Sequence, residues 1–95
     1  MNNQELRKLK ALAQRMDATV KLGKHGLTDA FVRGLNEELD RQELVKVRFD
    51  EFKDQKKELS PRIAEKTASH LVMRVGNVAV YFRRNPNPEK QRIKF

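Results

Sequence analysis

The sequence contains no cysteine, and this and other absences narrow the range of functions. Without cysteine the chain forms no disulfide and offers no thiolate ligand to a metal, which fits a reducing, cytosol-like compartment. No run of about 18 apolar residues occurs, and the amino terminus "MNNQELRKLK" lacks the apolar segment of a signal peptide. We therefore expect a soluble, unprocessed, cytoplasmic protein without a membrane partner.

Patterns typical of enzymes are absent as well. No cluster of His, Asp and Glu has metal-ligand spacing, and no serine or cysteine nucleophile motif occurs. A ribonuclease-like acid and base pair would need His25 and His70 to meet, and nothing in the sequence brings them together. We expect a protein that is not an enzyme and that uses no cofactor, no metal and no small-molecule substrate.

Positive charge is what the sequence has in excess. The 95 residues suffice for one domain with a single modest core, and they carry a net charge of +8. Residues 1–50 hold ten basic and eight acidic side chains, so most of the excess lies in the second half. Such a charge favours a polyanionic partner, nucleic acid first and an acidic membrane second, although many small basic proteins have neither.

Apolar periodicity predicts three helices and four strands in the order α-β-α-β-α-β-β. The helices are expected at residues 4–16, 29–41 and 61–69, and the strands at 19–22, 44–49, 71–75 and 78–83. This order predicts a single compact α/β domain over residues 1–84, in which a four-stranded mixed sheet is packed with three helices. Residues 85–95, with two prolines and several basic side chains, are expected to form a flexible tail.

Three local features support these boundaries. Thr28 is a good N-cap for the second helix, and Gly76–Asn77 suits a tight hairpin between the last two strands. Gly34 indicates either a close approach of the second helix to the sheet or simple tolerance. Pro61 allows a helix capped by Ser60 or a longer, kinked helix, and we favour a firm helix over 61–69 after a looser turn.

The stretch "GKHG", residues 23–26, lies between the first strand and the second helix. Its glycines permit a tight path, and the following helix start offers free N–H groups to a phosphate, with Lys24 and His25 as further donors. An ordinary turn explains the same letters equally well, and no Walker-type ending follows. If the first three strands are parallel, this loop, the turn after Phe49 and the Gly76 hairpin lie at one end of the sheet. Arg83 and Arg84 then lie at the other end.

Alternation in the strands suggests a second basic surface. Lys21, Lys46 and Arg48 occupy the polar sides of the first two strands, and Arg74, Tyr81 and Arg83 extend that surface if the hairpin faces match. A basic sheet face with a tyrosine can hold a single strand by charge and stacking. A merely solvated sheet face is the alternative. The first helix adds basic side chains on its polar face, Arg15 among them.

The succession "LKALAQ", "VKLGKHGLTDAFVRGLNEELDRQELVKVRF", "PRIAEKT" and "VGNVAVYFRR" resembles the CRM domain, the chloroplast RNA splicing and ribosome maturation family. The resemblance covers about residues 4–84 and is greatest to the free-standing prokaryotic members of the YhbY type. It implies an RNA-binding α/β fold similar to the C-terminal domain of translation initiation factor three. It also implies that Gly23, Lys24, His25 and Gly26 form the family's RNA-binding loop.

The function predicted from these observations is non-catalytic RNA binding by a monomer. The resemblance implies ribosomal RNA as the partner, because single-domain bacterial members are associated with precursors of the large ribosomal subunit. A nonspecific, architectural protein of duplex nucleic acid is the alternative, and a ribonuclease is a more remote one. The candidate RNA-binding residues are Gly23, Lys24, His25, Gly26, Lys21, Arg15, Lys46, Arg48, Arg74, Tyr81, Arg83 and Arg84.

Overall fold

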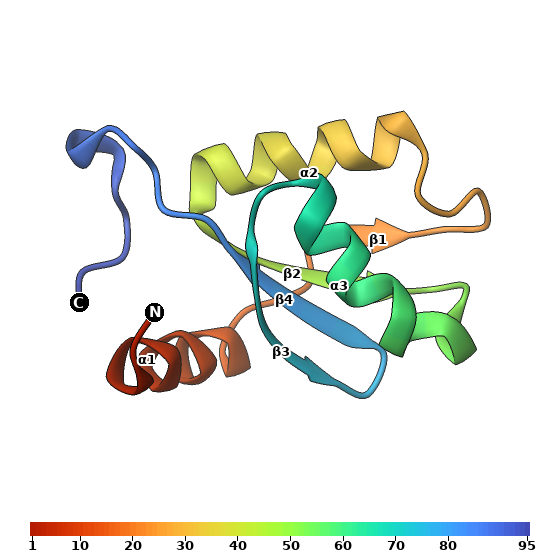
Figure 1. Cartoon of the computed structure of the whole chain (residues 1–95), viewed down its shortest axis with the longest axis horizontal. Coiled ribbons are helices and arrows are strands. Elements are labelled where there is room, and N and C mark those ends of the chain that lie inside the picture. Colours follow the sequence, from red (N-terminus) through yellow and green to blue (C-terminus); the bar gives the residue numbers. More distant parts are fainter.

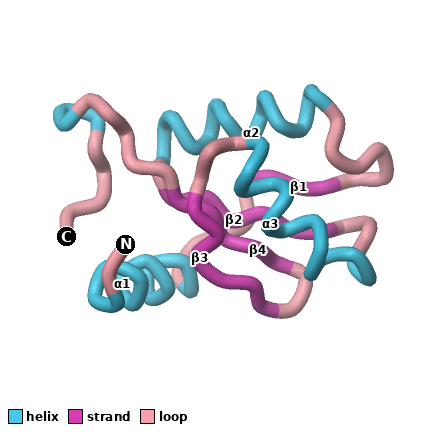
Figure 2. The backbone as a smooth tube through the Cα atoms, viewed as in Figure 1, coloured by secondary structure: helices cyan, strands magenta, loops and turns pink.

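A four-stranded sheet with helices on both faces forms the centre of the protein (Figures 1 and 2). The structure is a computed structural model that describes residues 1–95. Its helices are α1 (Asn3–Gln14), α2 (Asp29–Gln42) and α3 (Lys56–Lys66), with short 3-10 turns η1 (Lys53–Gln55) and η2 (Pro88–Lys90). Its strands are β1 (Val20–Leu22), β2 (Leu44–Phe49), β3 (His70–Val75) and β4 (Val78–Phe82). The predicted fold class and order of elements are confirmed.

The last strand of the chain lies inside the sheet. The strand order is β1-β2-β4-β3, with β1 parallel to β2 and β4 antiparallel to both of its neighbours. The strands β1, β2 and β3 therefore run in one direction. Their carboxyl ends bring together the loop after β1, the turn after β2 and the β3–β4 hairpin (Figure 1). A hydrogen bond of 2.7 Å from the Phe49 N–H to the Asn77 carbonyl joins the end of β2 to the β3–β4 hairpin.

The alternation of side chains divides the core between the two faces of the sheet. On one face Val45, Val47 and Phe49 pack with the inner sides of α2 and α3, and Tyr81 lies in the same cluster. On the other face the side chains of Leu44, Val80 and Phe82 pack against Leu9 and Ala13 of α1. Because α1 on one side and α2 with α3 on the other cover the middle strands, little of the sheet surface reaches solvent.

The ends of α2 are determined by local hydrogen bonds. The Thr28 hydroxyl accepts the Phe31 N–H at 3.0 Å, which confirms the predicted N-cap. The helix stops at Glu43, whose φ of 64° breaks the helical path and starts β2 one residue later. Gly34 within this helix makes no close approach, since a Cβ built on it meets no atom within 4 Å. It is therefore simply tolerated.

No helix is both long and apolar enough to cross a membrane.

The third helix differs from the prediction. It runs over Lys56–Lys66 with Pro61 in its interior, so Ser60 is a buried helical residue and not a cap. The looser turn expected before Pro61 is limited to η1. Pro61 has no N–H for the carbonyl of Lys57, but both residues are exposed, so water can satisfy that carbonyl.

The C-terminal tail, residues 85–95, is packed against the domain, contrary to the expected flexible segment. Ile93 is buried in the α1-side core, and the Phe95 ring meets the Phe82 ring edge-on at 5.9 Å. Lys8 of α1 donates to the carbonyl of Lys94, which ties the two ends of the chain together (Figure 1). The charge and proline content of the tail predicted disorder. Apart from its prolines, the tail has only two apolar residues that can anchor it to the domain.

The buried Glu43 carboxylate anchors this tail. Its oxygens accept the backbone N–H groups of Asn85 and Arg92 at 2.7 Å each and that of Ile93 at 3.1 Å. Burial alone would raise the pKa of the Glu43 carboxyl. The three N–H donors and the nearby Arg84 guanidinium outweigh burial and hold the pKa below its ordinary value of 4.5. Glu43 is therefore charged at neutral pH and closes the tail against α2.

Replacing Glu43 by glutamine tests this anchor. We expect Glu43→Gln to lower the free energy of unfolding by about 2 kcal/mol at neutral pH, because the amide keeps one acceptor and turns its NH₂ group toward N–H donors. The stabilising effect of a carboxyl with a lowered folded pKa is complete above its unfolded pKa and is lost as the pH falls through the folded value. The difference between wild type and variant should therefore shrink below a pH of about 4.

Urea unfolding at several pH values measures this difference. Glu37→Gln, on the exposed side of α2, is the matched control and should change little at any pH. A difference between Glu43→Gln and wild type that stays constant from neutral to acidic pH would contradict the charged anchor.

Candidate nucleic-acid interface

The GKHG loop, residues 23–26, is a tight turn with free backbone donors. The Gly26 N–H donates to the Gly23 carbonyl at 3.1 Å, and the Thr28 N–H donates to the Gly26 carbonyl at 2.9 Å. The N–H groups of Lys24 and His25 have no backbone acceptor, and both side chains are exposed. Free N–H groups beside the positive start of α2 form a suitable place for a phosphate.

The two glycines of the loop have different roles. Gly26 has a φ of +72°, a backbone conformation that favours glycine at this position of the turn. Gly23 has no such φ, and a Cβ built on it meets nothing within 4 Å. The fold does not require a glycine at position 23. The open space beside it is available to a ligand that approaches the backbone.

A cleft runs from the loop to the outer side of α3. It has a volume of about 410 Å³, and no Asp or Glu lines it. Arg62 and Lys66, four residues apart on α3, form its basic side. We call this the loop–α3 cleft; its lining residues are His25, Gly26, Leu27, Phe52, Gln55, Leu59, Arg62 and Lys66. Cations and free N–H groups thus converge here without an opposing carboxylate.

Lys21, Lys46 and Arg48 share the α1 side of the sheet, but they are not equally available. Lys21 is exposed and lies opposite Arg48 in the β1–β2 register. Arg48 is bound to Asp50 at 2.7 Å, and this hydrogen bond raises the pKa of Arg48 and lowers that of Asp50. Lys46 is half-buried, and its Nζ donates at 2.9 Å to the carbonyls of Ala13 and Met16, where it caps the end of α1.

Tyr81 and Arg74 of the hairpin lie on the opposite face, so the condition for one continuous basic face is not met. Tyr81 is fully buried under α3, and its hydroxyl donates to the Ser60 carbonyl at 3.0 Å. Burial raises the pKa of this hydroxyl. Arg74 shares that side, since it lies opposite Ala79 in the register. Tyr81 therefore has no free face on which a base can stack.

Arg83 and Arg84 lie at the end of the sheet away from the loop, as predicted, and both are engaged there. The Arg83 guanidinium donates to Asp40 at 2.8 Å and to the Thr67 carbonyl at 2.6 Å. Arg84 donates to the Ile93 carbonyl and lies over the Phe95 ring at 5.0 Å. These contacts hold α2, α3 and the tail together, so the guanidinium groups have a structural role.

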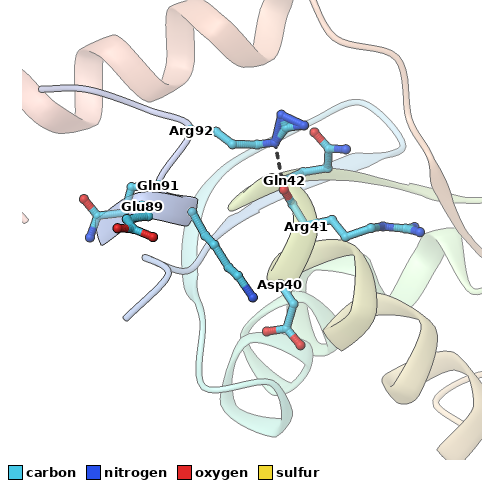
Figure 3. A pocket seen from close by; sticks show the side chains of 7 residues that line it. Asp40, Arg41, Gln42, Glu89, Gln91 and Arg92 are labelled. Carbon is cyan, nitrogen blue, oxygen red and sulfur yellow. Dashed lines mark hydrogen bonds between the residues drawn. The ribbon is translucent and has the colours of Figure 1, made fainter. Parts of the chain in front are cut away.

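Arg15 lies in the same half of the molecule as the tail, where it borders a hollow with Arg92 and Ile93. A larger hollow of about 740 Å³ separates the end of α2 from the tail (Figure 3). Its lining is polar and mixed in charge: Asp40, Arg41, Gln42, Glu89, Lys90, Gln91 and Arg92. The carboxylates of Asp40 and Glu89 repel a phosphate in this hollow. The loop–α3 cleft has no such carboxylate.

The two histidines do not meet. His25 lies in the loop after β1, whereas His70 begins β3 opposite Phe82, at the other end of the sheet. An acid and base pair would need both imidazoles within reach of one substrate atom. The structure therefore gives no support to the ribonuclease alternative. No group of three or more His, Cys, Asp or Glu side chains is placed to hold a metal ion.

A model of the CRS1/YhbY (CRM) domain matches residues 1–83, nearly the whole chain. The chain belongs to this family. The CRM match includes the GKHG loop, both strand-helix-strand crossovers and the final hairpin, and it ends where the tail begins. This result confirms the resemblance inferred from the sequence.

Two relatives extend the comparison. A Pseudomonas aeruginosa protein, "Probable RNA-binding protein PA4753", is 24% identical over 91 residues, which cover 95% of this chain and 88% of that protein. The solution structure of the Staphylococcus aureus protein SAV1595, which is described as a suspected RNA-binding protein, superimposes with a TM-score of 0.78. The two chains are 28% identical, and the match covers 99% of each.

Sequence reasoning missed three side chains of this CRM domain that the structure brings to the loop. Arg62 and Lys66 are four residues apart, so the sequence indicates that they are neighbours on one face of a helix. The sequence does not indicate that this face points toward the loop. Phe52 gave no signal, because it lies between β2 and η1 outside any periodic segment. Only the crossover through α3 places all three beside His25 and Gly26.

Proposed function

We propose that this CRM domain binds structured RNA through its GKHG loop and the adjoining loop–α3 cleft, without catalysis. The observation that carries the proposal is that the free N–H groups of Lys24 and His25 lie in a loop beside a cleft that His25, Arg62 and Lys66 line without any carboxylate. Phosphate contacts of this kind position a protein on RNA and make the affinity depend on salt. The names of the two relatives support RNA as the polyanion.

The distribution of charge supports this end of the molecule as the binding side. Lys21, Lys24 and Lys53 are exposed around the loop and the turn after β2. The far end of α2 carries the acidic side chains Glu37, Glu38 and Asp40, which repel a phosphate backbone. The turn after β2 also carries Asp50, Glu51 and Asp54, but none of these carboxylates lines the loop–α3 cleft.

Ribosomal RNA in precursors of the large subunit is the partner that we propose, with the protein as a monomeric assembly factor of the cytoplasm. This step rests on the resemblance to the free-standing prokaryotic CRM proteins. Nonspecific binding to duplex nucleic acid is the alternative, since a basic α/β domain can contact duplex phosphates without reading a sequence.

Reversal of the Lys24 charge tests the loop. We expect Lys24→Glu to weaken binding to a structured ribosomal RNA fragment about tenfold at low salt and less as the salt concentration rises, because a phosphate contact is lost and a repulsion is added. Fluorescence anisotropy titrations at several salt concentrations measure this effect. Lys90→Glu makes the same charge change on an exposed site in the tail and serves as the control.

Two results would count against the loop as the binding site. One is unchanged affinity of Lys24→Glu at every salt concentration. The other is an equal loss in Lys90→Glu, which would indicate that only the net charge of the molecule matters.

An added methyl group at Gly23 tests close approach without changing charge. Gly23→Ala places a Cβ in open space, so we expect an intact fold but an RNA affinity reduced about fivefold, because the methyl group occupies the space beside the loop backbone. Gly34→Ala is the matched control, since its Cβ also meets open space, in the middle of α2. It should raise the free energy of unfolding by about 1 kcal/mol and leave RNA binding unchanged. Equal affinities for the two variants would argue against close approach at Gly23.

The identity of the RNA is tested in cells. Ultraviolet crosslinking, purification of the protein and sequencing of the attached RNA should enrich precursors of large-subunit ribosomal RNA over other transcripts. In a companion competition assay at matched salt, structured RNA should displace the bound probe more effectively than duplex DNA. Preference for duplex DNA would favour the architectural alternative, and enrichment of unrelated transcripts would reject the ribosomal assignment.

A further inference from the structure

An aromatic residue occupies a position in the loop–α3 cleft where the backbone disfavours it. Phe52 has a φ of 59° and a ψ of 32°, the left-handed region in which glycine or asparagine is usual and a bulky residue is rare. Its ring is half-buried: one edge reaches Gly26 and part of it packs on the α2–α3 side of the core. The remaining surface lines the cleft. A turn that only reversed the chain would be built at lower cost with glycine.

On the side of this ring that lines the loop–α3 cleft the neighbouring groups favour a phosphate, whereas its other side borders Asp50, Glu51 and Asp54. His25 brings a free backbone N–H group and its imidazole from the loop, with Lys24 next to it in the chain, and Arg62 and Lys66 bring cations from α3. No carboxylate lines the cleft. The larger hollow in Figure 3 contains Asp40 and Glu89 and has no aromatic side chain. The loop–α3 cleft therefore combines an aromatic surface with positive charge and has no lining carboxylate.

We propose that the loop–α3 cleft holds one unpaired nucleotide of the bound RNA, with its base against the Phe52 ring and its phosphates between the GKHG loop and Arg62. A volume of about 410 Å³ lies within the range of small-ligand sites, about 300–1,000 Å³. A base in a duplex is stacked between its neighbours and has no free face for the ring, so the nucleotide must be unpaired. This inference rests on the proposed function and specifies which part of a structured RNA is recognised.

Two substitutions at Phe52 distinguish the effect of the aromatic ring on RNA binding from the effect of an apolar side chain at this position. Phe52→Leu keeps an apolar side chain against the core, and Phe52→Tyr keeps the ring. We expect Phe52→Leu to bind a short single-stranded oligoadenylate about fivefold to tenfold more weakly than wild type, because base stacking on the ring is lost. Its affinity for the same strand paired with oligouridylate should not change, and Phe52→Tyr should retain both affinities. Phe95→Leu, in the tail, is the control and should also retain both.

Fluorescence anisotropy of the labelled RNAs distinguishes the outcomes. An equal loss on both RNAs, no loss on either, or failure of tyrosine to preserve binding would overturn the proposal for the cleft. If Lys24→Glu weakens binding while Phe52→Leu does not, the proposed function stands and the nucleotide site is wrong. If wild-type protein binds neither these RNAs nor the ribosomal RNA fragment at low salt, the proposed function itself fails.

A second measurement on the wild-type chain does not depend on how the leucine variant folds. An oligonucleotide that carries iodouracil crosslinks to aromatic side chains that contact the base, and peptide mapping then identifies the attached residue. We expect attachment at Phe52. Attachment only at other aromatic residues, or none with RNA that is demonstrably bound, would overturn the proposal.

Discussion

The burial of β4 on both faces is the constraint on which the rest of the structure depends. Ala79 and Tyr81 face α2 and α3, Val80 and Phe82 face α1, and all four are buried. A strand of this kind is stable only in the middle of a sheet with helices on both sides. The insertion of β4 between β2 and β3 satisfies this requirement. Together with the helices on both sides, it leaves neither face of β4 open to solvent.

The two ends of the sheet are chemically different as a consequence. At one end Arg83, Arg84 and the Glu43 carboxylate are used in contacts that join α2, α3 and the tail. At the other end the N–H groups of Lys24 and His25 are not used, and the cations of α3 have no carboxylate beside them in the cleft. These N–H groups lie on an exposed loop, where water satisfies them and where they remain accessible to a ligand.

The sequence was informative where one local rule decided the outcome. Thr28 caps α2 and the Gly76–Asn77 hairpin joins β3 to β4, because capping and turn chemistry act over three or four residues. The parity of Val45, Val47 and Phe49 correctly placed them on one face. Period-two alternation did not reveal that β4 has two buried faces, and it therefore left open whether Tyr81 and Arg83 share a surface with Lys21, Lys46 and Arg48. Composition likewise did not reveal that Ile93 and the Glu43 carboxylate hold the tail.

What the sequence by itself determined is the order of elements, the family and the loop, because each of these is written in short stretches whose spacing is preserved in the fold. What only the tertiary structure decided is which cations remain available. Lys46 and Arg83 became internal donors because helices pack over them, while Arg62 and Lys66 were brought to the loop by the crossover through α3. Side-chain availability depends on contacts between residues far apart in the chain, and a linear pattern does not contain that information.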